Sequence, residues 1–218
     1  MWPVSGKVAS RTPPALRFRS CRCFRLRAEG ADQASPAMTG ACLIHRWCKI
    51  FAMRVLGIDC GTEYTGYGVV EESGDGRLLC HAVGAIRLHS RDALPVRLHS
   101  IFCRLTELIQ QYQPQDVAIE DVFYALNVKS ALKLGQVRGV AMLAAASAGL
   151  PVAEYAPLSI KSAVVGYGRA EKSQVQQMVA RLLCLPSLPQ PSDAADALAI
   201  AICHLHTAAT LARQAAVP

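Results

Sequence analysis

The pattern of hydrophobic and polar positions changes its period several times after residue 52. Short apolar runs bounded by turn residues predict three strands, at 55–59, 67–71 and 78–86, with turns at 61–66 and 73–76. From Leu94, apolar residues recur every three or four positions, which predicts an amphipathic helix that ends before Pro114. The remaining pattern predicts strands at 117–119 and 151–155 and helices at 127–148, 171–183 and 194–209. The predicted order is βββαβαβαα, with no internal repeat.

This order is typical of an α/β domain built on a mixed five-stranded sheet flanked by helices. Residues 53–218 have the length of one domain, since about 100–200 residues are expected per domain. The longest weakly interrupted apolar run, 140–150, is about half of the ~20 residues that a membrane-spanning helix needs. We therefore expect one soluble domain, with no membrane as a partner.

The net charge of +7 comes from the first 52 residues, which hold nine basic and two acidic side chains. This segment shows almost no periodicity, so we predict a disordered basic extension. It could be a transit peptide, a DNA-binding arm or a region upstream of a misassigned start. Met53 stands directly before the first strand and favours the last interpretation, an artefactual or dispensable extension. The rest is neutral, with an acidic stretch at 53–126 and a basic one at 127–172.

Four acidic residues stand where predicted strands end or the last helix starts: Asp59, Glu120, Asp193 and Asp196. If the first and fourth strands are parallel neighbours, all four carboxylates could share one pocket, because Asp193 and Asp196 project from one helix face. Crowded carboxylates repel one another, and Mg²⁺ relieves this while its remaining positions take water and phosphate oxygens. Two such ions could promote hydrolysis of a phosphodiester.

Each acid also has a simpler interpretation. Asp59 could end a strand at a turn, Glu120 could be an exposed strand end, and Asp193 with Asp196 could cap a helix. The combination of the four favours a functional site. The nine cysteines include no CxxC pair, and those after residue 53 are expected to be reduced, buried thiols; His204 and His206 diverge on a helix and are expected to be packing or surface residues.

Residues 53–206 resemble the RuvC family of Holliday-junction resolvases, crossover junction endodeoxyribonucleases with an RNase H-like fold. The resemblance rests on motifs that occur in this order: Gly57-Ile58-Asp59-Cys60-Gly61, Thr65-Gly66-Tyr67-Gly68, Ala118-Ile119-Glu120-Asp121-Val122-Phe123, Ser130-Ala131-Leu132-Lys133-Leu134-Gly135-Gln136, Val164-Val165-Gly166, Gly168-Arg169-Ala170-Glu171-Lys172 and Asp193-Ala194-Ala195-Asp196-Ala197-Leu198-Ala199. Each motif alone is weak, and their order and spacing together are specific.

The resemblance implies that the four acids are catalytic and bind Mg²⁺, two ions per site with Mn²⁺ as a possible substitute. It implies a cytoplasmic homodimer that nicks four-way junction DNA symmetrically in recombination and repair, together with the RuvA–RuvB branch-migration complex. It also implies that Phe123 stacks on bases near the cut and that Lys161 and Lys172 hold DNA. Arg169, in the same basic stretch, could neutralise phosphates.

Two positions depart from the family pattern. Cys60 stands where proline is common, and Leu126 stands where a basic residue is usual. Two other functions remain open: a module that binds branched DNA without cutting it, and an ATPase of the actin or Hsp70 type, whose first phosphate-binding turn resembles 57–62. The four acids argue against the binding module, and the single domain argues against the ATPase.

Overall fold

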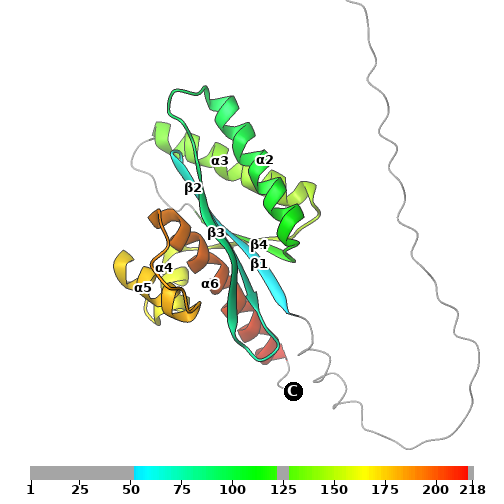
Figure 1. Ribbon diagram of the computed structural model, residues 1–218, viewed down its shortest axis with the longest axis vertical. Helices are drawn as coiled ribbons and strands as arrows, with labels where there is room; N and C mark the ends of the chain where they lie inside the picture. The colour runs from blue at the N-terminus through cyan, green and yellow to red at the C-terminus, as the bar shows by residue number, and fades with distance from the viewer. Residues whose placement is uncertain (1–51, 122–127, 216–218) are drawn as a thin grey trace, which may run out of the picture. The chain divides into compact units, whose positions relative to one another are not determined.

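The computed structural model describes residues 52–121 and 128–215 of the chain. A sheet of five strands has the order β3-β2-β1-β4-β5 (Figure 1). Its strands are β1 (Met53–Asp59), β2 (Tyr64–Glu72), β3 (Leu78–Arg87), β4 (Asp116–Glu120) and β5 (Val152–Tyr155). β1, β2 and β3 are antiparallel neighbours, whereas β1, β4 and β5 run parallel to one another. The predicted mixed five-stranded sheet is confirmed.

Helices cover both faces of this sheet (Figure 1). One face carries α2 (Leu94–Tyr112) and α3 (Val128–Ser147), and the other carries α4 (Pro157–Val165), α5 (Lys172–Leu182) and α6 (Ser192–Ala215). Side chains alternate along β1, so that Leu56 and Ile58 enter the core under α2 and α3 while Val55 enters the core under α6. The two faces therefore have separate apolar cores.

The helix α6 packs unusually close to the sheet because glycines face it. A Cβ atom at Gly57 would lie 2.1 Å from the carbonyl oxygen of Ala197, and one at Gly66 would lie 2.0 Å from that of Asp193. Only glycine can stand at these positions without moving the helix. Ser192–Leu211 is long and apolar enough to cross a membrane, but most of it is buried against the sheet, as in the core helix of a domain.

The predicted elements are confirmed in order and type, with two errors. The segment 61–66 was predicted to be a turn, but β2 already begins at Tyr64, because the glycine at 66 serves close packing and not a turn. The helix α4 was not predicted. Its nine residues lack a clear amphipathic period, although Pro157 in the first turn and the left-handed Gly166 at the end are typical helix signals.

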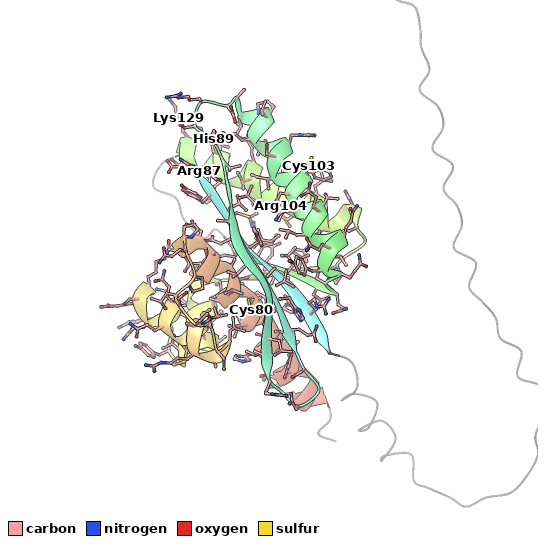
Figure 2. The ribbon with its side chains drawn as sticks, viewed as in Figure 1. Cys80, Arg87, His89, Cys103, Arg104 and Lys129 are labelled. Carbon is pink, nitrogen blue, oxygen red and sulfur yellow. The ribbon has the colours of Figure 1, made fainter. Side chains whose placement is uncertain are left out.

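The histidine and cysteine predictions are confirmed in part. His204 is buried, and its two ring nitrogens are hydrogen-bonded to the Tyr155 hydroxyl and to Asp116 Oδ2, both at 2.9 Å. It is therefore a packing residue that ties α6 to β4 and β5. All five described cysteines are free, including Cys80 on β3 and Cys103 on α2 (Figure 2). Of the five, Cys203 is buried as predicted, Cys60, Cys80 and Cys103 are half-buried, and the prediction of buried thiols is wrong for Cys184, which is exposed just after α5.

Candidate active site

Two parallel strands and one helix bring the four acids to the same end of the sheet. Asp59 is the last residue of β1 and Glu120 the last residue of β4. Because Ile58 pairs with Ile119 in the parallel ladder, the two acids leave neighbouring strands side by side. Asp193 and Asp196 lie in and next to the first turn of α6, which the glycines hold against β1 and β2. A Cβ atom on Gly61, two residues after Asp59, would be 3.9 Å from Asp193 Oδ1.

The charges of these acids act on one another. The pKa of Asp59 is raised from 3.8 to about 7, first by burial and then by the negative charges of Asp196, Glu120 and Asp193, while Lys172 opposes the shift. Burial and the charge of Asp196 also raise the pKa of Glu120. The negative charges of the other three acids therefore act on Asp59, and they add to the larger effect of its burial.

A cavity of about 250 Å³ opens beside this group, between the end of β4 and the helices α4, α5 and α6. Glu120 and Asp196 line it together with Lys161 and Lys172. Lys172 Nζ lies 2.6 Å from Asp196 Oδ2. Burial alone would lower the pKa of Lys172, but the ion pair with Asp196 and the charges of Asp193 and Asp59 raise it on balance. The cavity thus has an acidic wall and a basic wall, which suits a phosphate group that approaches a bound cation.

The two lysines lie on two helices, and a capping box fixes the place of Lys172. Glu171 and Gln174 form a capping box at the start of α5, so Lys172 occupies the first helical position. Lys161 lies on α4, the helix that sequence reasoning missed, and it is half-buried. The same helix contributes Ile160 to the cavity wall. The apolar character of this residue was the only sequence signal that position 160 would be buried.

The other predicted DNA contacts are not gathered at this cavity. Arg169 is exposed in the loop before α5 and does not line the cavity. Phe123 and Leu126 lie outside the described residues. Cys60 packs against the core under α2 and α3, on the opposite side of the sheet from the acids, and burial followed by the charge of Asp59 raises the pKa of its thiol to about 12.

The donor set of the site suits a hard divalent cation. Within residues 52–121 and 128–215, no group of three or more His, Cys, Asp or Glu side chains is placed so that it could hold a metal ion by itself. The four acids nevertheless offer only oxygen atoms, and their mutual repulsion is what a cation would relieve. Mg²⁺ needs only one or two carboxylates and completes its shell with water and phosphate oxygens. The residues present therefore fit Mg²⁺.

Comparisons with known proteins show the family of the chain. The model of a family described as crossover junction endodeoxyribonuclease RuvC matches residues 55–204. A curated relative with the same description, from Koribacter versatilis (strain Ellin345), is 66% identical over 161 residues, which are 74% of this chain and 97% of the relative.

Two solved structures are similar throughout the domain. A structure of Thermus thermophilus RuvC is 35% identical with a TM-score of 0.68, over 72% of this chain and 96% of that chain. T. thermophilus RuvC in complex with a Holliday junction substrate is 32% identical with a TM-score of 0.67, over the same shares. These matches confirm the family resemblance, and the sheet confirms the predicted fold class of a mixed five-stranded sheet flanked by helices.

Proposed function

The chain belongs to the RuvC family of crossover junction endodeoxyribonucleases, and we propose that it resolves four-way DNA junctions by paired symmetric nicks in recombination and repair. The observation that carries this proposal is the meeting of two strand ends and one helix start, where coupled carboxylates face two lysines across one cavity. The residues that match the Koribacter relative cover 97% of that relative, so the proposal concerns the whole activity of the family.

We infer that Asp59, Glu120, Asp193 and Asp196 hold two Mg²⁺ ions per site, with Mn²⁺ as a substitute. When bound, these ions supply Lewis-acid stabilisation of the phosphate and lower the pKa of a bound water. The chain's own residues do the rest. The acids would fix the positions of the cations, and the raised pKa of Asp59, caused by burial and then by the charges of Asp196, Glu120 and Asp193, shows that positive charge is favoured there.

The lysines bind and orient the substrate strand. Lys161 and Lys172 line the cavity beside Glu120 and Asp196, so their ammonium groups can each pair with a phosphate oxygen of the cleaved strand. Lys172 would exchange part of its contact with Asp196 for that phosphate. The exposed Arg169 extends the positive surface along the DNA backbone. Phe123 is proposed to stack on a base next to the cut, which contributes about 1–3 kcal/mol per base.

A second copy of the chain completes the enzyme, since two symmetric nicks need two active sites. The helix α3 presents an apolar stripe at helical spacing: Val128 and Leu132 are 72% and 64% exposed, and Leu143 is 57% exposed. Between them, Gly135 and Gly139 have no atom within 4 Å of a Cβ position, so the surface there is open to a neighbour. This pattern suits helix-on-helix packing, and we propose that the stripe is the dimer interface.

The proposal extends to the setting of the enzyme. Its relatives are bacterial proteins, and we propose a cytoplasmic enzyme that receives its junctions from the RuvA–RuvB branch-migration complex. The four acids distinguish it from a module that only binds branched DNA, because negative charge facing phosphates weakens binding unless cations are held there.

The test uses the full chain, Mg²⁺ and a mobile synthetic four-way junction. We expect paired nicks on strands of like polarity whose products a ligase can seal, and no cleavage in EDTA. A linear duplex of the same sequence is the matched control and should stay intact. Junction binding without any cleavage would support a binding module, and degradation of the linear duplex would indicate a general nuclease; either result would contradict the proposal.

A further inference from the structure

Arg138 of α3 bridges two carboxylates at the ends of β4 and β5. Its Nη2 atom forms an ion pair with Asp121 Oδ1 at 3.3 Å and a second ion pair with Glu154. The side chain is only 19% exposed. Its Nε atom is buried and has no hydrogen-bond partner among the described residues. Burial of the arginine charge costs desolvation free energy, which indicates that the fixed position of Arg138 has a role.

The two carboxylates belong to the strand ends that carry the active site. Asp121 directly follows Glu120, and its backbone N–H donates a 2.8 Å hydrogen bond to the Tyr155 carbonyl oxygen, which extends the β4–β5 pairing beyond Glu120. Glu154 is paired with Ile119 in the same ladder. Because side chains alternate across a sheet, Asp121 and Glu154 point toward α3 while Glu120 points to the opposite face, toward α6.

We propose that Arg138 is a positioning residue that fixes the direction of the Glu120 carboxylate from the reverse face of the sheet. This inference rests on the proposed nuclease function.

A device of this kind is needed because of where Glu120 stands. The strand β4 ends at Glu120, and its pairing with β5 continues past that residue through the hydrogen bond from the Asp121 N–H to the Tyr155 carbonyl oxygen. Asp196 lines the same cavity as Glu120, and the two negative charges repel each other. On this proposal, the ion pair between Arg138 and Asp121 restrains the residue after Glu120 from the other face of the sheet and so keeps the Glu120 carboxylate directed at the site.

The test compares Arg138→Met, which keeps most of the apolar stem and removes the charge, with Arg138→Lys. Three properties are measured on the full chain: junction affinity in EDTA, the single-turnover cleavage rate at saturating enzyme, and Mn²⁺ affinity by electron paramagnetic resonance. We expect Arg138→Met to keep its junction affinity but to lose about 10- to 100-fold in cleavage rate and in Mn²⁺ affinity, as for other residues that orient metal ligands. Arg138→Lys should recover part of both losses.

Arg104→Met is the matched control. Arg104 lies on α2 (Figure 2), is paired with Glu107 at 3.0 Å and stacks over the Tyr67 ring, so these contacts involve its own helix and β2 and not the ends of β4 and β5. This variant should cleave and bind Mn²⁺ like the wild type. If Arg138→Met does not fold, Glu154→Gln replaces it, because loss of one of the two ion pairs should give a smaller loss of the same kind.

Two results would overturn the proposal. A folded Arg138→Met protein with normal Mn²⁺ affinity and normal rate at saturation would show that Arg138 only stabilises the fold. A loss of junction affinity with a normal rate at saturation would make Arg138 a DNA contact. Both outcomes differ from a failure of the proposed function, in which the wild type itself would not cleave junctions.

Discussion

The two faces of the sheet differ in how closely their helices pack and in the charges that they place there. On the face of α6, Gly57 and Gly66 let the helix backbone approach the strands, and this contact holds two acids beside the acidic ends of β1 and β4. On the face of α3, Gly135 and Gly139 are exposed, and a Cβ atom at either position would have none of the described residues outside the helix backbone within 4 Å. Glycine thus allows close helix packing beside the candidate active site on one face, and it leaves an open helix surface on the other face.

The same contrast holds for the charged residues. The acids of the α6 face are crowded, and the raised pKa of Asp59 records an unfavourable interaction that burial and repulsion create together. The acids of the α3 face, Asp121 and Glu154, each form an ion pair with Arg138, so their negative charge is partly compensated. An enzyme that binds cations needs uncompensated negative charge at the site, whereas the supporting face needs charges that are already satisfied.

The largest effect should follow removal of one charge from the crowded face. Asp196→Asn is expected to lower the single-turnover cleavage rate about 1,000-fold or more, or about 4 kcal/mol in barrier height, because a ligand of the cations is lost. Junction affinity in EDTA should not fall. Asp75→Asn, in the exposed β2–β3 turn, is the control and should cleave normally. Cleavage by Asp196→Asn at the wild-type rate would show that Asp196 has no role in catalysis.

The next effect concerns stability and compares glycines on the two faces. Gly57→Ala would place a Cβ atom 2.1 Å from the Ala197 carbonyl oxygen, so we expect a loss of about 3 kcal/mol in the free energy of unfolding or no folded protein. Gly139→Ala meets no atom and should stabilise α3 by up to about 1 kcal/mol. Chemical denaturation measures both. Equal losses in the two variants would contradict the close packing of α6.

A smaller effect is expected from the basic wall of the cavity. Lys172→Gln should weaken junction binding and reduce the slope of log affinity against log salt by about one, since one phosphate contact is lost. Arg181→Gln, an exposed change in the last turn of the same helix, is the control. Binding titrations between low and moderate salt provide the measurement. An unchanged slope for Lys172→Gln would show that this lysine pairs with Asp196 and does not contact a DNA phosphate.

The smallest effect on the chemistry should come from the α3 face. Leu132→Glu places a charge in the exposed apolar stripe and should shift the protein from dimer to monomer in analytical ultracentrifugation. The metal affinity of each subunit should remain normal. Leu79→Glu, at another exposed apolar position, should leave the assembly unchanged. A dimer that survives Leu132→Glu would locate the interface elsewhere.

Much of the site could be predicted because its acids mark the ends of regular elements. Asp59 and Glu120 follow short apolar runs, and the only further assumption was that β1 and β4 are parallel neighbours, which the sheet confirms. The predicted roles of the four acids and of the DNA-binding residues remain predictions, as does the basic extension at 1–52.

The features that escaped prediction depend on contacts between distant parts of the chain. Gly66 was interpreted as a turn residue because nothing local shows that α6 will lie against it. Arg138 is one basic residue among several in its stretch, and its value depends on two carboxylates that the fold brings together. The helix α4 was missed because its residues face both a core and a cavity, which removes a clear apolar period.

The central claim is that four carboxylates share one pocket that cations neutralise, and the most direct test is the unfolding temperature of wild type and Asp59→Asn across pH. The folded pKa of Asp59, about 7, lies above its unfolded value near 3.8. The unfolded state therefore releases this proton first, and the wild type loses stability as pH rises from about 4 to 7. Asparagine carries no such penalty.

In EDTA, the account predicts that Asp59→Asn unfolds at the same temperature as the wild type, or lower, near pH 4 and gains on it steadily up to about pH 7. Added Mg²⁺ should then raise the unfolding temperature of the wild type more than that of the variant and close the gap. A difference that does not change with pH, together with equal stabilisation of both proteins by Mg²⁺, would contradict the claim.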